Sequence, residues 1–157
     1  MAILDERLEF ADGVSVAAAA GTALIGDVIN LDVARDIGVG KPLYLVLRCA
    51  TSIITGGLAG TIKFQLVSDA QAAVAVDGSA TVHYDTGTFV TDGDDANELD
   101  AGALIAVIAL PREGNAYEQY LGILATVATT TVTDGAIDAF ITENPPGGWK
   151  AYPDASN

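Results

Sequence analysis

The sequence has few of the groups on which enzyme chemistry depends. It contains one histidine (His83), one cysteine (Cys49) and one tryptophan (Trp149), and aromatic residues make up only 6% of the chain. A single cysteine cannot form a disulfide within the chain. Because covalent and acid–base catalysis need a nucleophile and a base held together, this composition favours a binding or structural protein over an enzyme. We therefore expect no enzyme activity, no catalytic residue and no cofactor.

Basic residues are scarce as well. The chain has 7 Lys and Arg against 21 Asp and Glu, a net charge of −14. Nucleic acids and anionic membranes are bound by clustered Lys and Arg, so neither is expected as a partner. A cationic or mixed-charge protein surface would be attracted instead. Five of the seven basic residues fall within residues 1–63, and a neutral or positive contact surface would come from that half.

The sequence also lacks long hydrophobic runs. The longest apolar stretch, Ala101 to Leu110, is too short to span a bilayer. The first ten residues, MAILDERLEF, show no basic segment followed by an apolar one. These two observations predict a soluble protein that is synthesised in a cytoplasm.

Several segments alternate apolar and polar residues, as strands with one buried face do. They are residues 29–33, 43–49, 61–66 and 81–85. The alternation places Cys49 in an inward row and His83 on a polar face. Two further runs, Leu104–Leu110 and Leu121–Val127, are apolar on both faces, which predicts cover on both sides, in a sheet centre or at a subunit contact. Residues 137–142 predict the last strand.

Clusters of Gly, Pro and Asp separate these runs, as expected for turns. About eight short strands predict an all-β fold, a jelly-roll type β-sandwich with at most one short helix and extended termini. Candidate helices are residues 71–75, capped by Ser68 or Asp69, and one or two turns within residues 3–11. The expected organisation is an N-terminal arm (1–20), the jelly-roll sandwich (21–143) and an irregular C-terminal tail (144–157).

Each reactive group has a structural interpretation. Cys49 is expected to be a buried thiol that acts as a small hydrophobe, and His83 a surface or interface residue. The acidic segment Asp92–Asp100 does not match a calcium loop, since its Gly comes second. We interpret it as a solvated loop, with a weak hard-cation site as the alternative. No metal ligand set, nucleotide-binding loop or hydrolase motif is present.

The two ends carry the candidate contact residues. At the N-terminus, Leu4, Leu8 and Phe10 form an apolar stripe interleaved with charges that include Arg7. At the C-terminus, Trp149 and Tyr152 follow a Pro-Pro-Gly-Gly segment. Either end could pack onto the chain's own sandwich or bind a neighbour.

An ordered series of short motifs resembles one protein family. The series is Leu8-Glu9-Phe10, Gly26-Asp27-Val28-Ile29-Asn30-Leu31, Phe64-Gln65-Leu66-Val67-Ser68-Asp69-Ala70, Tyr84-Asp85-Thr86-Gly87, Leu99-Asp100-Ala101-Gly102, Ala109-Leu110-Pro111-Arg112-Glu113 and Tyr120-Leu121-Gly122-Ile123. It resembles the capsid cement (decoration) proteins of tailed phages, the jelly-roll family typified by the Bordetella phage cement protein. The resemblance extends from about Leu8 to about Phe140 and rests on order and spacing.

The resemblance implies a jelly roll that assembles as homodimers on the outer face of an icosahedral head. There it would bridge copies of the major capsid protein without enzyme activity or cofactor. The family supplies no individual functional residues.

We therefore expect a virion protein that stabilises the capsid from outside. Its expected partners are the major capsid protein and itself, as a homodimer or a trimer. The apolar arm (Leu4, Arg7, Leu8, Phe10) would anchor it, together with Trp149 and Tyr152. Arg35, Lys41 and Arg48 would pair with capsid carboxylates. The first alternative is a lectin-like carbohydrate- or receptor-binding sandwich, with calcium at Asp92–Asp100 as an optional aid. The second, ranked behind it, is a small hydrolase.

Overall fold

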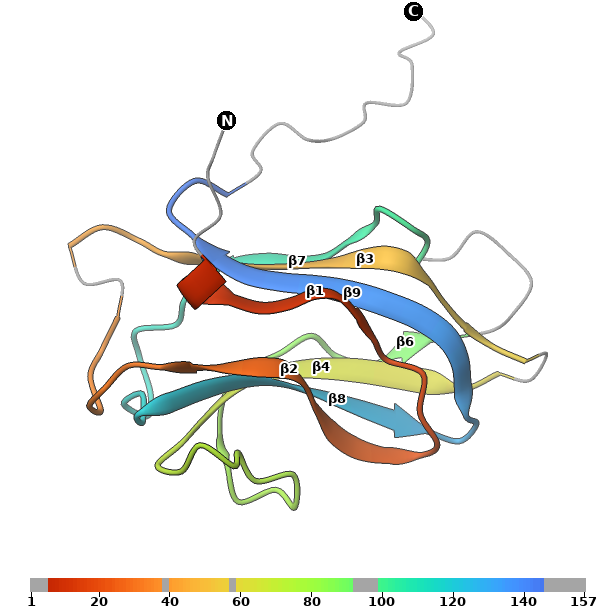
Figure 1. Cartoon of the computed structure of the whole chain (residues 1–157), viewed down its shortest axis with the longest axis horizontal. Coiled ribbons are helices and arrows are strands. Elements are labelled where there is room, and N and C mark those ends of the chain that lie inside the picture. Colours follow the sequence, from red (N-terminus) through yellow and green to blue (C-terminus); the bar gives the residue numbers. More distant parts are fainter. Residues whose placement is uncertain (1–5, 38–39, 57–58, 92–98, 146–157) are drawn as a thin grey trace, which may run out of the picture.

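A computed structural model describes residues 6–37, 40–56, 59–91 and 99–145. In this part the chain forms two antiparallel sheets and one short 3₁₀ turn (Figure 1). The elements are η1 (Glu6–Leu8), β1 (Glu9–Ser15), β2 (Gly21–Asn30), β3 (Tyr44–Thr55), β4 (Thr61–Asp69), β5 (Thr81–Asp85), β6 (Phe89–Val90), β7 (Leu104–Ala109), β8 (Tyr120–Ala128) and β9 (Val132–Thr142). The predicted all-β class is confirmed.

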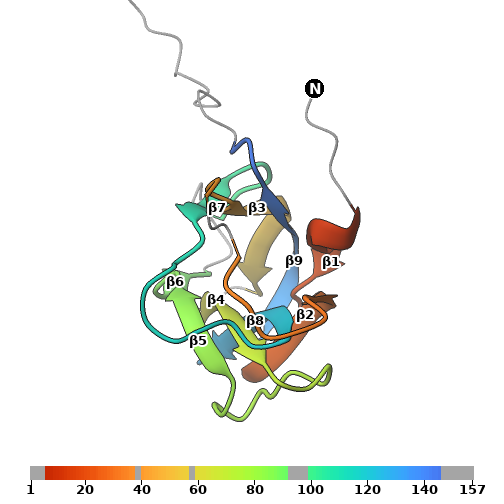
Figure 2. The ribbon, with the colours of Figure 1, turned by 90° about the vertical axis from the view of Figure 1, so that its left-hand side faces the viewer.

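The strand order identifies the sandwich as a jelly roll. The first sheet, called sheet A here, has the order β1-β9-β3-β7, and sheet B has the order β2-β8-β4-β5, with the two-residue β6 also paired to β4. If the two-residue β6 is left out and the other eight strands are renumbered in chain order, the two sheets have the strand orders 1-8-3-6 and 2-7-4-5. These are the two Greek keys of a jelly roll. Seen end-on, the two sheets form two layers, with β7 and β1 at opposite edges of sheet A (Figure 2).

The core lies between the two layers and is built from alternate residues of their strands. Its largest fully buried members include Phe10, Leu45, Leu47, Ile62, Phe64, Leu66, Leu121, Ile123 and Ile137. Cys49 continues the inward row of β3 and is 1% exposed, so the predicted buried thiol is confirmed. Burial first, and then the charge of Asp100, raises the pKa of this thiol to about 12.

A small second cluster covers the outer face of sheet B. The loop between β4 and β5 places Val74 against Val67 and Leu124, so β8 is covered on both faces, as predicted for Leu121–Val127. The helix predicted at residues 71–75 is wrong. Asp69 instead accepts hydrogen bonds from the backbone N–H groups of Gln71 (3.0 Å) and Ala75 (2.9 Å), which hold this segment as a loop.

The N-terminal region differs most from the sequence prediction. The described part of residues 3–11 holds one 3₁₀ turn and the start of a strand, and residues 9–15 of the expected arm are β1, paired with β9. The strand predicted at residues 29–33 is β2, which begins at Gly21 and ends at Asn30. It ends there because Asn30 Oδ1 accepts the Asp32 N–H at 2.8 Å, and Asp32 turns with a φ of 65°.

Gly26 permits β1 and β2 to approach each other. It lies at a register shift of β2 and has a φ of +66°, and a Cβ placed on it would lie 1.9 Å from the Phe10 carbonyl oxygen. Only glycine meets both requirements. The close contact holds the two edge strands side by side and seats Phe10 in the core.

We expect Gly26→Ala to lower the free energy of unfolding by roughly 2–4 kcal/mol, because steric overlap adds to left-handed backbone strain. Gly13→Ala is the matched control. Gly13 has a φ of +59° but nothing within 4 Å of its Cβ position, so its cost should be about 1 kcal/mol of strain alone. Urea titrations of both variants measure the difference, and equal costs would contradict the steric account.

Candidate partner-binding surfaces

The outer face of sheet A carries a buried carboxylate that joins three strands. Asp138 on β9 is 6% exposed. Its Oδ2 accepts the Nε–H of Arg48 on β3 at 2.6 Å, and its Oδ1 accepts the backbone N–H of Gly13 on β1 at 2.7 Å. The charged partner and the backbone donor together satisfy this carboxylate. Arg48 is therefore a structural partner within its own sheet.

Beside this ion pair runs a strip of apolar side chains. Val46 of β3 pairs with Val107 of β7 on one side and with Phe140 of β9 on the other. Val46 is buried, whereas Val107 and Leu104 of β7 are 36% and 43% exposed. The strand β7 is thus covered on one face only. The prediction that Leu104–Leu110 is covered on both sides in the centre of a sheet is therefore wrong. The other expectation, a subunit contact, stays a prediction.

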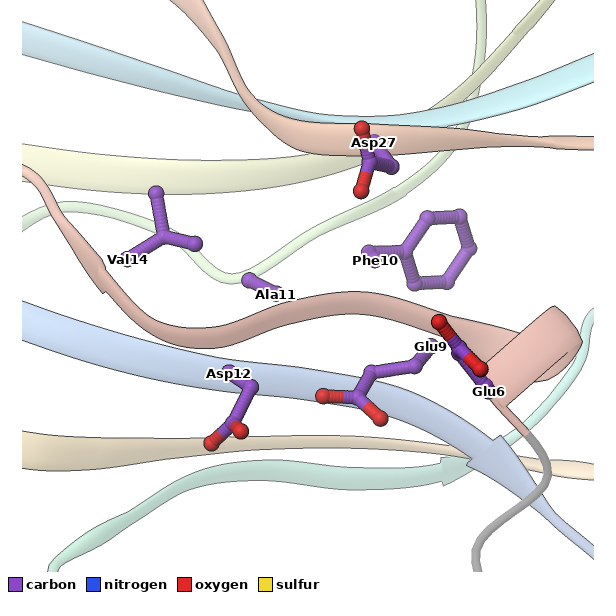
Figure 3. A pocket seen from close by; sticks show the side chains of 7 residues that line it. All are labelled: Glu6, Glu9, Phe10, Ala11, Asp12, Val14 and Asp27. Carbon is purple, nitrogen blue, oxygen red and sulfur yellow. The ribbon is translucent and has the colours of Figure 1, made fainter.

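An acidic groove of about 460 Å³ lies between the edge strands β1 and β2. Figure 3 shows Glu6, Glu9 and Asp12 along η1 and β1, with Asp27 opposite them on β2. Burial raises the pKa of Glu9, and the charges of Asp12, Asp138 and Glu6 raise it further. Within the described residues, no group of three or more His, Cys, Asp or Glu is placed to hold a metal ion. The groove is a concentration of negative charge.

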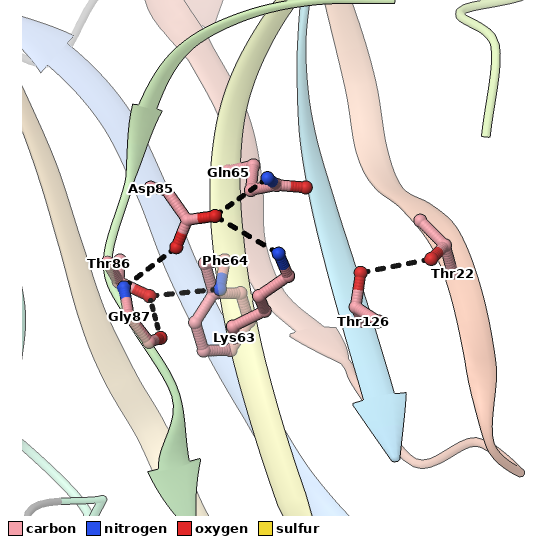
Figure 4. Close-up of polar contacts among 8 residues, drawn as sticks. All are labelled: Thr22, Lys63, Phe64, Gln65, Asp85, Thr86, Gly87 and Thr126. Atoms are coloured by element: carbon pink, nitrogen blue, oxygen red, sulfur yellow. Dashed lines mark hydrogen bonds and ion pairs between the residues drawn. The ribbon is translucent and has the colours of Figure 1, made fainter. Parts of the chain in front are cut away.

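The outer face of sheet B beyond the Val74 cluster is polar (Figure 4). Asp85 Oδ2 accepts hydrogen bonds from Lys63 Nζ (3.1 Å) and Gln65 Nε2 (2.8 Å), and its Oδ1 accepts the Gly87 N–H (2.8 Å). Partial burial raises the pKa of Asp85, but these donors together outweigh it and lower the pKa overall. The face offers a fixed polar network.

His83 lies inside the edge of sheet B, and its predicted orientation is wrong. A register shift between Leu66 and Val67 changes the alternation on β5. Val82, predicted inward, is 46% exposed, while the His83 ring stacks on Tyr117 with centroids 4.0 Å apart and its Nε2 is 2.7 Å from Ser68 Oγ. The Tyr117 hydroxyl donates to the Pro111 carbonyl at 2.7 Å, and burial raises its pKa to about 12.

Burial of His83 favours the neutral ring. Ser68 Oγ accepts the backbone N–H of Glu118 at 3.1 Å and lies 2.7 Å from His83 Nε2, so this hydroxyl links the ring to the segment before β8. Burial lowers the pKa of His83, and the nearby carboxylate of Glu118 opposes that shift. His83 is therefore a structural link between β4, β5 and the segment before β8.

The predicted apolar arm is placed differently by the structure. Leu4 lies outside the described residues. Arg7 is exposed on η1, and Leu8 is half-buried against the core. Phe10 is 1% exposed and belongs to the core, so the expectation that its side chain is an exposed anchor is wrong. Phe10 is buried because it lies on β1, which pairs with β9 in sheet A.

The predicted basic contacts are already engaged within the chain. Lys41 forms an ion pair with Glu143, Arg48 with Asp138, and Arg35 donates to the Leu31 carbonyl. Each of the three side chains has a different partner, and no contact among the described residues joins them in one patch. Their role as free cations for capsid carboxylates is therefore not supported by the geometry.

Two further candidates cannot be compared with the structure. Trp149 and Tyr152 lie outside the described residues, as does most of Asp92–Asp100. In contrast, the exposed strip on β7 falls within Leu104–Leu110, for which a subunit contact was one of the two expectations from the sequence. Its signal in the sequence is that Leu104–Ala109 contains no charged residue at all.

We expect the single histidine to titrate below 6.5 in the folded protein, because burial disfavours the charged ring. Because the pKa of His83 is lower in the folded state than in the unfolded state, the neutral ring stabilises the fold fully above about pH 6.5. This stabilisation is lost as the pH falls below that value. Proton NMR of the imidazole signals measures the pKa. The control is His83→Gln, which removes the titrating ring, and the free energy of unfolding of both proteins is compared between about pH 7 and pH 5. A native pKa at or above 6.5 would contradict the assignment.

Comparison with known proteins adds one match. A family model described as Bbp16 matches residues 10–141 of the chain, which includes all but the first residue of β1 and all but the last residue of β9. No curated protein matches. In the described part of the chain, no helix has the length and apolarity needed to cross a membrane.

Proposed function

The chain belongs to the Bbp16 family, and from that premise we propose that it is a structural virion protein that binds the outer surface of a phage capsid. There it stabilises contacts between major capsid proteins. The family match agrees with the resemblance to the Bordetella phage cement family, and this agreement is the observation that carries the proposal. The protein is made in the host cytoplasm and acts on the assembled head without a cofactor.

The fold suits this role. A jelly roll exposes two sheet faces and four long edges, so one small subunit can contact several neighbours at once. Many weak contacts made together resist separation far better than each alone, because the second contact is intramolecular once the first has formed. A capsid under outward pressure from its genome is held by such a clamp.

Charge decides which capsid surface would attract it. The chain carries a net charge of −14, and Lys41, Arg48 and Lys63 are each paired with an acid of the same chain. A basic surface on the capsid protein therefore fits better than the carboxylates that we expected from the sequence. Electrostatic attraction of this kind is weakened by salt.

We expect saturable co-sedimentation with undecorated phage shells, with affinity that falls at least about tenfold between roughly 50 mM and 500 mM salt. Asp12→Asn with Asp27→Asn removes two charges from the groove. Asp32→Asn with Glu113→Gln removes two exposed charges elsewhere and is the control. A larger loss for the groove pair would place the attraction there.

Failure to bind shells at low salt would contradict the proposal. Retention on a glycan array, lost with a calcium chelator, would support the lectin-like alternative in its place. A measurable turnover that one acidic substitution abolishes would support the hydrolase.

A further inference from the structure

Four Asp-Gly dipeptides occur in the chain, at residues 12–13, 77–78, 92–93 and 134–135. This dipeptide can rearrange without an enzyme, because glycine has no Cβ to shield its backbone nitrogen from the carboxyl group of the preceding aspartate. Residues 92–93 lie outside the described part of the chain. The other three dipeptides differ in what surrounds the carboxylate and the glycine N–H, and these surroundings decide which of them reacts.

In the dipeptide on β9, the two reacting groups are held together. The Gly135 N–H donates to Oδ1 of Asp134 at 2.8 Å, so the nitrogen lies against the carboxyl group whose carbon it would attack. Reacting atoms that are held about 3–3.5 Å apart are in the range of a near-attack arrangement. Asp134 is exposed, which gives water access to its carboxyl group.

A register shift keeps this N–H out of the ladder. The pairing of β9 with β3 includes Asp134 and Ala136 but leaves Gly135, between them, without a paired residue. The pairing of β9 with β1 ends at Ala136. Within the described residues, the Gly135 nitrogen is therefore not committed to a neighbouring strand, and its bond to Asp134 takes the place of a ladder bond.

The other two described dipeptides are arranged differently. Gly13 donates its N–H to Oδ1 of Asp138 at 2.7 Å, so a side chain of another strand engages this nitrogen. In the loop between β4 and β5, Oδ1 of Asp77 accepts the N–H and the hydroxyl of Ser79 at 3.0 and 2.7 Å. One dipeptide thus has its nitrogen occupied and the other its carboxylate. Of the three, Asp134 alone turns its carboxylate to the N–H of its own glycine.

We propose that Asp134-Gly135 is a site of spontaneous isomerisation, at which the main chain of β9 passes from the α-carboxyl to the β-carboxyl group of Asp134. The carboxyl group reacts in its neutral form. The Gly135 nitrogen bonds to Cγ, the bond from Cγ to the hydroxyl oxygen breaks, and the hydroxyl leaves with the amide proton as water. A water molecule then opens the cyclic imide. Opening at the main-chain carbonyl leaves isoaspartate, and opening at Cγ restores aspartate.

Isoaspartate adds a methylene group to the main chain before Gly135, where β9 has no room for it. A Cβ placed on Gly135 would lie 2.8 Å from Cα of Ile53, and the Gly135 carbonyl accepts the Val16 N–H at 2.9 Å. The added group displaces Gly135 from one of these two neighbours. The end of β1 is attached next to this point, through the pair of Ser15 and Ala136. The modification therefore loosens the junction of β1 and β9 as the protein ages.

The test is peptide mapping of the whole protein after several weeks at neutral pH and body temperature. Electron-transfer fragmentation distinguishes isoaspartate from aspartate. We expect isoaspartate to form at residue 134 at least about threefold faster than at residue 12 or 77, because proximity accelerates ring closure. The same protein unfolded in urea is the control. Without the folded geometry, the three rates should agree within about a factor of two.

Three matched variants give a second measurement. Asp134→Asn, Asp77→Asn and Asp12→Asn change exposed positions, and the same ring closure then releases ammonia, which mass spectrometry of the intact protein detects. We expect Asp134→Asn to react fastest. Asp134→Glu keeps the charge but lengthens the side chain, and should hold the urea midpoint of unfolding constant during incubation while that of the wild type falls.

Absence of isoaspartate at residue 134 would overturn the proposal, as would faster formation at residue 12 or 77. An excess at residue 134 that persists in urea would overturn it as well, because it would come from the local sequence and not from the fold. The inference does not depend on capsid binding and would stand if shell binding failed.

Discussion

The structure depends on one constraint: every backbone hydrogen-bonding group at the edge of a sheet must find a partner or be guarded. Two apolar sheet faces pack against each other and supply the core, but a sandwich, unlike a closed barrel, leaves its edges open. The chain guards three of its longer edges with acids and register shifts, and Gly26 brings two of them, β1 and β2, into close contact. The fourth edge, β7, is left apolar and uncharged.

The acidic residues and the few basic ones occupy different places in the structure. Negative charge gathers in the groove of Glu6, Glu9, Asp12 and Asp27 between β1 and β2. Three of the basic residues form ion pairs within the molecule, as Arg48 does with Asp138. This distribution is the physical basis of the proposed attraction to a basic partner.

Much of the fold could be predicted from the sequence, because six of the strands alternate or run apolar in the way that strands do. The predictions that were wrong depend on contacts between residues that are far apart in the chain. A register shift opposite Leu66 turned His83 inward, and Val74 found an apolar face to cover, which outweighed the helix propensity of its alanine neighbours. Phe10 was predicted to be an exposed anchor because the sequence does not show that β1 pairs with β9, which lies over a hundred residues later in the chain. The basic residues seemed free for the same reason: the acid that pairs with Arg48 is 90 positions later.

The central claim is that β7 is an open edge of the sandwich, and amide hydrogen exchange tests it residue by residue. The N–H groups of Val107 and Ala109 have no backbone partner within the described part of the chain. The account predicts that both amides exchange rapidly in dilute solution, while those of Ala106 and Ile108, which face β3, stay protected. Protection of Val107 and Ala109 together with rapid exchange of Ala106 and Ile108 would contradict it.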